Sequence, residues 1–260
     1  MIRVNSAAPS AFWAPLRSVR KAGLVVAILA LGAVQAWANV IVPSALTNVE
    51  GNTNNGFPFN LANFGLTSQR YQQVYSSSEF SGLFLITDIE FRPDAGGGAA
   101  FSSTLPSIQI DLSTTTAAVD GLSSTFSANV GSNDTIVFSG PLSLSSSFTG
   151  PAGGPKNFDI VIVLQTPFLY DPALGNLLLD VRNFGGGSTT QFDAENTFGD
   201  TVSRVTTNSN ASGVNSPTAD LNDTFGLITS FSGVAAAPEP GTLALVGLAV
   251  AGLAWRRRKS

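Results

Sequence analysis

Hydrophobic and polar residues alternate over several short stretches between residues 40 and 237. Leu85, Ile89 and Phe91, for example, occupy alternate positions, and the polar residues Asp88 and Glu90 lie between them. A period of two residues is typical of a β-strand that buries one face and exposes the other. Strands are therefore predicted at the following residues: 85–92, 108–113, 158–165 and 177–182, with shorter candidates near 134–139, 142–148, 189–193, 202–207 and 224–231.

Clusters of glycine and proline separate these stretches, at residues 92–98, 150–155 and 185–187. Glycine permits positive φ and proline fixes φ, so such clusters mark turns and loops. No amphipathic helix pattern interrupts the strands. We predict an all-β fold, an antiparallel β-sandwich with jelly-roll-like connections, as one domain over residues 39–234.

The N-terminal segment has a different pattern. Basic residues precede an apolar run of 13 residues at 22–34, and the small residues Ala36 and Ala38 follow. This order is typical of a secretory signal peptide. We predict a signal helix within residues 1–38 and cleavage between Ala38 and Asn39; a retained membrane anchor or a buried helix is the alternative.

A second apolar run covers Gly241 to Ala254, with Thr242 its one polar residue. As a helix these 14 residues would span roughly 21 Å at about 1.5 Å per residue, less than the roughly 30 Å hydrocarbon core of a bilayer. Trp255 closes the run, and a basic cluster follows: Arg256, Arg257, Arg258 and Lys259. Because tryptophan and basic residues mark the cytoplasmic end of a membrane span, we predict a short transmembrane helix at 241–255 and a basic end at 256–259.

Pro238-Glu239-Pro240 stands directly before this run. The three parts in order, Pro-Glu-Pro, apolar helix and arginine cluster, resemble the PEP-CTERM sorting signal, so residues 235–260 would be a sorting tail that begins with a short alanine spacer. The resemblance implies a Gram-negative bacterium that makes exopolysaccharide. It also implies that a membrane-embedded exosortase recognises Pro238, Glu239 and Pro240 and removes the tail. The alternative is a permanent C-terminal anchor.

The central part of the chain also resembles a recurrent type of PEP-CTERM substrate. Four segments carry this likeness: residues 48–52, 70–75, 89–94 and 176–181. The likeness implies an exported module and assigns it no activity.

Charge and composition exclude several classes of function. Residues 39–240 hold 5 basic and 17 acidic residues, a net charge of −12, whereas contacts to nucleic-acid phosphates need lysine and arginine. The chain has no cysteine and no histidine, which excludes Ser-His-Asp and Cys-His catalysis and zinc sites built on those ligands. We therefore expect a protein that is not an enzyme and does not bind nucleic acid.

Carboxylate chemistry is the remaining catalytic alternative. A glycosidase needs two carboxyl groups at a defined separation and neither histidine nor a metal. Asp88 with Glu90, and Asp193 with Glu195, are such pairs if each lies on one face of a strand. Carboxylates so placed are more often solvated, and the expectation is no catalytic residue.

Calcium is the one ion that the sequence favours, because loops near residue 195 are rich in oxygen ligands. The predicted ligands are Asp193, Glu195, Asn196 and Asp200. A second acidic cluster comprises Asp220, Asn222 and Asp223. Neither cluster has EF-hand spacing.

Carbohydrate binding usually relies on tryptophan and tyrosine rings. Every tryptophan lies in the predicted signal or tail, and Tyr71 and Tyr75 in a polar stretch offer a small aromatic patch. Taken together, the sequence predicts a non-enzymatic protein exported by the secretion machinery, held transiently in the inner membrane, and sorted to the cell surface or the exopolysaccharide matrix. A carbohydrate- or calcium-binding adhesion module and a glycosidase-like enzyme on matrix polysaccharide are the alternatives.

Overall fold

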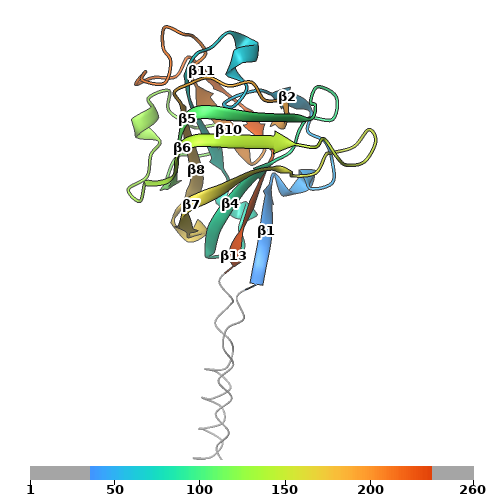
Figure 1. The fold of residues 1–260 in the computed structure, drawn as a ribbon. Helices are drawn as coiled ribbons and strands as arrows, with labels where there is room; N and C mark the ends of the chain where they lie inside the picture. Colours follow the sequence, from blue (N-terminus) through green and yellow to red (C-terminus); the bar gives the residue numbers. More distant parts are fainter. Residues whose placement is uncertain (1–35, 236–260) are drawn as a thin grey trace, which may run out of the picture. The chain divides into compact units, whose positions relative to one another are not determined.

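The structure, a computed structural model, describes residues 36–235, which form thirteen strands and five short 3-10 helices (Figure 1). All strand pairs are antiparallel. The fold is therefore all-β, as the alternating pattern predicts. The predicted signal helix and transmembrane helix lie outside the described residues. Within residues 36–235, no helix has the length and apolar character needed to cross a membrane.

The strands form three sheets. The six-stranded sheet has the order β11 (Leu221–Asp223), β10 (Val202–Thr206), β3 (Gln69–Tyr75), β8 (Asn176–Asn183), β5 (Phe101–Thr115) and β6 (Thr135–Ser146). The four-stranded sheet has the order β1 (Ala36–Val42), β13 (Thr229–Ala235), β4 (Phe84–Phe91) and β7 (Ile160–Tyr170). The three-stranded sheet has the order β12 (Phe225–Leu227), β9 (Phe192–Asn196) and β2 (Thr53–Asn55). The 3-10 helices are η1 (Ser44–Leu46), η2 (Leu61–Phe64), η3 (Ser77–Glu79), η4 (Phe126–Ala128) and η5 (Pro172–Leu174).

The two larger sheets bury one core between them. Tyr75 of the six-stranded sheet meets Phe231 of the four-stranded sheet edge to face, with ring centroids 4.9 Å apart. The Tyr75 hydroxyl also shares a 2.9 Å hydrogen bond with Thr229 Oγ1. Phe80 extends the aromatic contact from Phe231 to Tyr170. Offset and edge-to-face rings are favourable beyond their buried area, so these contacts hold the sheets together.

Strand β4 departs from strict alternation. Ile86 and Ile89 are both fully buried, although they lie three residues apart. The register against β13 shifts between Ile86 and Asp88, so Thr87 is an extra residue in a β-bulge relative to β13. The register against β7 shifts at the same place, but there the extra residues lie on β7, between Val163 and Phe168. The bulge turns Leu85 to the outer face of the sheet, whereas an unbroken period of two places Leu85 and Ile89 on one face.

The alternating pattern also misses central strand β3. Gln69, Gln72 and Gln73 are fully buried there because their side chains hydrogen-bond within the protein. Strand β6, in contrast, joins two stretches predicted as separate strands, and the predicted strand near 224–231 is divided between β12 and β13.

The first and last described strands pair with each other. The register runs from Ala36 opposite Ala235 to Val42 opposite Thr229. The two ends of the described chain therefore lie side by side at one end of the domain (Figure 1).

Gly233 makes the bulge in β4 possible, because a Cβ at this position would overlap the carbonyl oxygen of Leu85. Gly233→Ala is expected to lower the free energy of unfolding by about 1–3 kcal/mol, as overpacked sites do. Gly82→Ala is the control, because no atom lies within 4 Å of its added Cβ. Urea unfolding of both variants measures the difference, and equal stabilities would contradict this role of Gly233.

Candidate functional site

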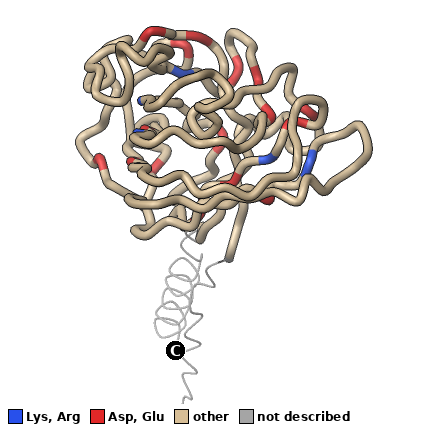
Figure 2. Tube along the Cα trace, turned by 45° about the horizontal axis from the view of Figure 1, so that its top comes forward, with Lys and Arg blue, Asp and Glu red and all other residues tan. Residues whose placement is uncertain are grey.

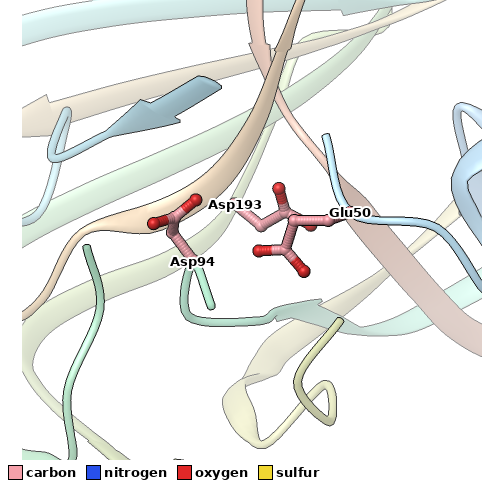
Figure 3. A group of neighbouring side chains, drawn as sticks. All are labelled: Glu50, Asp94 and Asp193. Carbon is pink, nitrogen blue, oxygen red and sulfur yellow. The ribbon is translucent and has the colours of Figure 1, made fainter. Parts of the chain in front are cut away.

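Three carboxylates from distant parts of the sequence meet beside β9: Glu50, Asp94 and Asp193, called here the carboxylate cluster (Figure 3). One oxygen of each lies within 4.8 Å of one oxygen of each of the others. Asp193 is on β9, Asp94 follows the end of β4, and Glu50 precedes β2.

Backbone hydrogen bonds explain why the chain brings β4 and β9 together here. Asp193 N donates to Arg92 O, and Asp94 N donates to Gln191 O, both at 3.0 Å. Pro93 and Phe192 form an antiparallel bridge between these two bonds. Asp94 and Asp193 are consequently held by main-chain pairing.

Arg92 is the cation next to the cluster. Its Nε donates to Asp193 Oδ2 at 2.6 Å, and both side chains are almost completely buried. Its Nη2 donates to the carbonyls of Leu46 and Val49 at 3.0 and 2.6 Å. Its guanidinium also lies 5.0 Å from the ring centre of Phe158. Arg92 thereby ties the segment before Glu50 to β9.

Backbone amides occupy one oxygen of each carboxylate. Gly51 N donates to Asp193 Oδ1 at 2.9 Å, and Ala95 N donates to Glu50 Oε1 at 2.5 Å. The amides of two glycines after Asp94 donate to its Oδ1. Glu50 Oε2, in contrast, is buried and accepts no hydrogen bond from the described residues. The cluster therefore contains a buried oxygen that has acceptor capacity to spare.

Burial raises the pKa of Asp193 to about 7. Arg92 acts against this rise, and the nearby charge of Glu50 adds to it. Three carboxylates beside one guanidinium carry a net charge of −2 when all are ionised. Bound protons or a divalent cation would relieve that excess of negative charge.

Of the four cation ligands predicted from the sequence, Asp193 belongs to the carboxylate cluster. Glu195 Oε1 instead accepts a hydrogen bond from Asn52 Nδ2 at 2.6 Å, and Asn196 lies at the end of β9. Asp200 lies in the loop before β10, and its Oδ1 accepts from the Val202 amide at 2.8 Å. The structure thus gives Asp193 different neighbours from those that its sequence position predicts.

The second predicted acidic cluster is also divided among separate contacts. Asp223 pairs with Arg204 at 2.8 Å, and Asn222 Nδ2 donates to the carbonyl of Leu122. Asp220 accepts hydrogen bonds from the loop at residues 208–212, and these lower its pKa.

Sequence reasoning missed Glu50 and Asp94. Both lie in segments that carry the likeness to PEP-CTERM substrates, residues 48–52 and 89–94. The presence of one acidic residue in each of these two segments is the sequence feature that could have suggested that Glu50 and Asp94 lie together. Spacing along the chain gives no such signal, because the pairing arises only when β4 meets β9.

The predicted aromatic patch does not exist at the surface. Tyr71, Tyr75 and Tyr170 are fully buried, so none offers a ring to a sugar. Tyr71 and Tyr75 belong to the core between the sheets. The polar stretch around them is a buried strand rather than an exposed platform.

The predicted carboxylate pair Asp88 and Glu90 lies on the outer face of β4, within a network of hydroxyl groups. Glu90 accepts hydrogen bonds from Ser230 Oγ at 2.9 Å and Ser232 Oγ at 2.7 Å. Asp88 Oδ2 accepts from Thr87 Oγ1 at 2.7 Å. These contacts give both carboxylates a structural part in the sheet.

The predicted cleavage residues Ala36, Ala38 and Asn39 lie in β1 and pair with Ala235, Gly233 and Ser232. Cleavage between Ala38 and Asn39 stays a prediction. The predicted sorting residues lie outside the described part of the chain: Pro238, Glu239, Pro240, Trp255, Arg256, Arg257, Arg258 and Lys259.

The raised pKa of Asp193 predicts how stability depends on pH. A carboxyl with a higher pKa in the folded state binds protons more tightly there, so stability falls as pH rises from about 4 to about 7. Asp111 and Asp200, with pKa values raised to about 6 by burial, act in the same direction. The melting temperature measured without divalent cations should fall by several degrees between pH 5 and pH 8, since about 1 kcal/mol corresponds to roughly 2–4 °C at this size.

Glu50→Gln should flatten this dependence, because it removes a charge that raises the pKa of Asp193. Glu79→Gln is the matched control, since Glu79 is also half-buried and accepts one backbone hydrogen bond, from Ser44 N. Identical slopes for the two variants would show that Glu50 does not act on Asp193.

Comparison with known proteins identifies the C-terminal segment. No curated protein and no solved structure matches the chain. Residues 236–259 match the family model described as the PEP-CTERM protein-sorting motif. This match contains Pro238, Glu239, Pro240 and the basic cluster. The chain is therefore a protein that carries a PEP-CTERM sorting domain.

Proposed function

We propose that this chain is an exported, non-enzymatic β-sandwich protein whose tail is recognised and removed by an exosortase. The observation that carries the proposal is the sorting motif at residues 236–259, which begins directly after the last residue of β13. The folded domain and the motif are thus consecutive and do not overlap. Such an order leaves the domain intact when the tail is cut.

The proposal includes a route. Residues 1–38 direct the chain to the secretion machinery, and residues 241–255 hold the precursor in the inner membrane of a Gram-negative bacterium. Exosortase processing then releases the domain to the cell surface or to the exopolysaccharide matrix. The apolar runs at 22–34 and 241–254 support this route.

The proposed fold is an antiparallel sandwich with jelly-roll-like connections. Its support is the single core shared by the two larger sheets. A non-enzymatic role is supported by the lack of histidine and cysteine in the sequence and by the structural hydrogen bonds of the paired carboxylates.

Mass spectrometry of the protein from its own cells tests the sorting proposal. The mature C-terminus is expected near Pro238, and replacing Pro238, Glu239 and Pro240 together by alanine should leave the tail attached. Thr242→Val is the control, because it keeps the apolar run and leaves the motif unchanged. A wild-type protein that still ends at Ser260 would refute processing.

A second candidate function is binding of a divalent cation, calcium by its oxygen ligands, at the carboxylate cluster. Buried Glu50 Oε2, which accepts no hydrogen bond from residues 36–235, is the observation that favours it. The separation of up to 4.8 Å between the three oxygens is about twice a calcium–oxygen distance of roughly 2.4 Å. One ion could therefore contact all three carboxylates and neutralise their excess charge.

Thermal unfolding of the full chain in detergent at pH 7.5 tests cation binding. Millimolar calcium should raise the melting temperature by several degrees, because a ligand that binds only the folded state stabilises it. Glu50→Gln should abolish the shift, and Glu79→Gln should retain it. No shift in the wild-type protein, or equal shifts in both variants, would exclude calcium from the cluster.

A further inference from the structure

An apolar row crosses the outer face of the four-stranded sheet at one end of the domain. Trp37 of β1 lies opposite Val234 of β13, Val234 lies opposite Leu85 of β4, and Leu85 lies opposite Leu169 of β7. The neighbours of these residues along each strand point into the core, so the row points outward. Side chains directly opposite in adjacent strands are about 5 Å apart and form a continuous surface.

The two ends of the row are strongly exposed: Trp37 by 73% and Leu169 by 59%. Leu85 and Val234 between them are half-buried, and Leu83 beside β4 is 44% exposed.

Farther along the same face, the outward positions of β4 are occupied by the carboxylates Asp88 and Glu90 instead of by an apolar residue such as Leu85. Val161 and Val163 of β7 are also exposed on this face, at 39% and 65%, but they lie opposite Glu90 and Asp88. The outward row that is apolar on all four strands is therefore the one at the end where β1 begins and β13 stops.

A cavity of about 270 Å³ opens at the same end. Its lining includes Val40, Phe80, Leu83, Phe84 and Ala235. Exposed apolar patches of this kind mark surfaces that contact another protein or a membrane.

The position of the sorting tail favours a membrane as the partner of this surface. Ala235 is the last residue of β13, and the apolar run of the sorting tail begins only six residues later, at Gly241. Six residues reach at most roughly 20 Å, even fully extended. The exposed row is thus tethered within that distance of the segment that is proposed to enter the membrane.

We propose that this end of the domain rests on the surface of the lipid bilayer while the sorting tail is attached. The contact surface comprises Leu83, Leu85, Leu169 and Val234, called here the apolar end face. The inference depends on the proposed membrane insertion of residues 241–255. Trp37 belongs to the surface in the precursor and leaves it if the signal peptide is cut after Ala38.

The charge of the domain favours a contact that is apolar and limited to this end. Residues 36–235 hold five basic residues and sixteen of the seventeen acidic residues; Glu239 is the remaining acidic residue. The acidic residues are spread over the domain (Figure 2). Anionic lipid headgroups repel such a domain. The apolar end face offers a contact that does not depend on charge, and it would set the orientation of the domain above the tail.

A single cysteine at Leu169 tests the contact, since the natural chain contains no cysteine. The full chain with Leu169→Cys, labelled with bimane, is placed in phosphatidylcholine vesicles with and without nitroxide-labelled headgroups. Val161→Cys is the control on the same strand and face: it lies opposite Glu90, whereas Leu169 lies opposite Leu85. Five residues of β4 separate these positions, about 15 Å.

At least twofold stronger quenching at position 169 than at position 161 is expected. Equal quenching in a chain that floats with the vesicles would overturn the inference and leave the insertion of the tail intact. If the bimane at position 169 is shielded from water only at high protein concentration, and the nitroxide-labelled headgroups do not quench it, the surface contacts a second copy of the chain and the inference is overturned. Failure to float would refute tail insertion, and the bilayer contact with it.

Discussion

The buried ion pair between Arg92 and Asp193 is the interaction on which the candidate site depends. The two groups are 2.6 Å apart, and their side chains are 1% and 0% exposed. Removing one partner of such a pair costs about 3–5 kcal/mol, because the other charge stays buried without compensation. Since Arg92 also binds the carbonyls of Leu46 and Val49, one side chain joins the end of β4, the segment around η1 and strand β9.

This ion pair also explains why negative charge accumulates beside it. Arg92 holds the chain directly before Glu50, and the Gly51 amide directly after Glu50 donates to Asp193. The Asp94 amide donates to the carbonyl of Gln191, so both carboxylates are held beside Asp193. One guanidinium balances one of the three. The fold therefore maintains a local excess of negative charge, held in place by the Arg92 side chain and by the main-chain hydrogen bonds of Asp94 and Asp193.

The sequence predicts those parts of the molecule that depend on local pattern. Strand β7 and, apart from its bulge, strand β4 follow from alternation, because one face of each meets the core. The pattern also predicts strand β8, although both of its faces are buried. Strand β3 could not be predicted in this way, since its buried glutamines find hydrogen-bond partners supplied by other strands. The bulge at Thr87 and the meeting of Glu50 with Asp193 depend likewise on which strands become neighbours, which no local pattern records.

The pairing of β1 with β13 connects the two ends of the chain physically. Cleavage after Ala38 would remove three of the seven residues of β1 and leave Asn39 as the first residue of the strand. Gly233, Val234 and Ala235 would then keep hydrogen-bonding partners on β4 alone. The end of β13, directly before the sorting motif, would become a sheet edge with unpaired amides and carbonyls. Removal of the signal peptide would thus loosen the connection to the motif while the core around Phe231, farther along β13, stays closed.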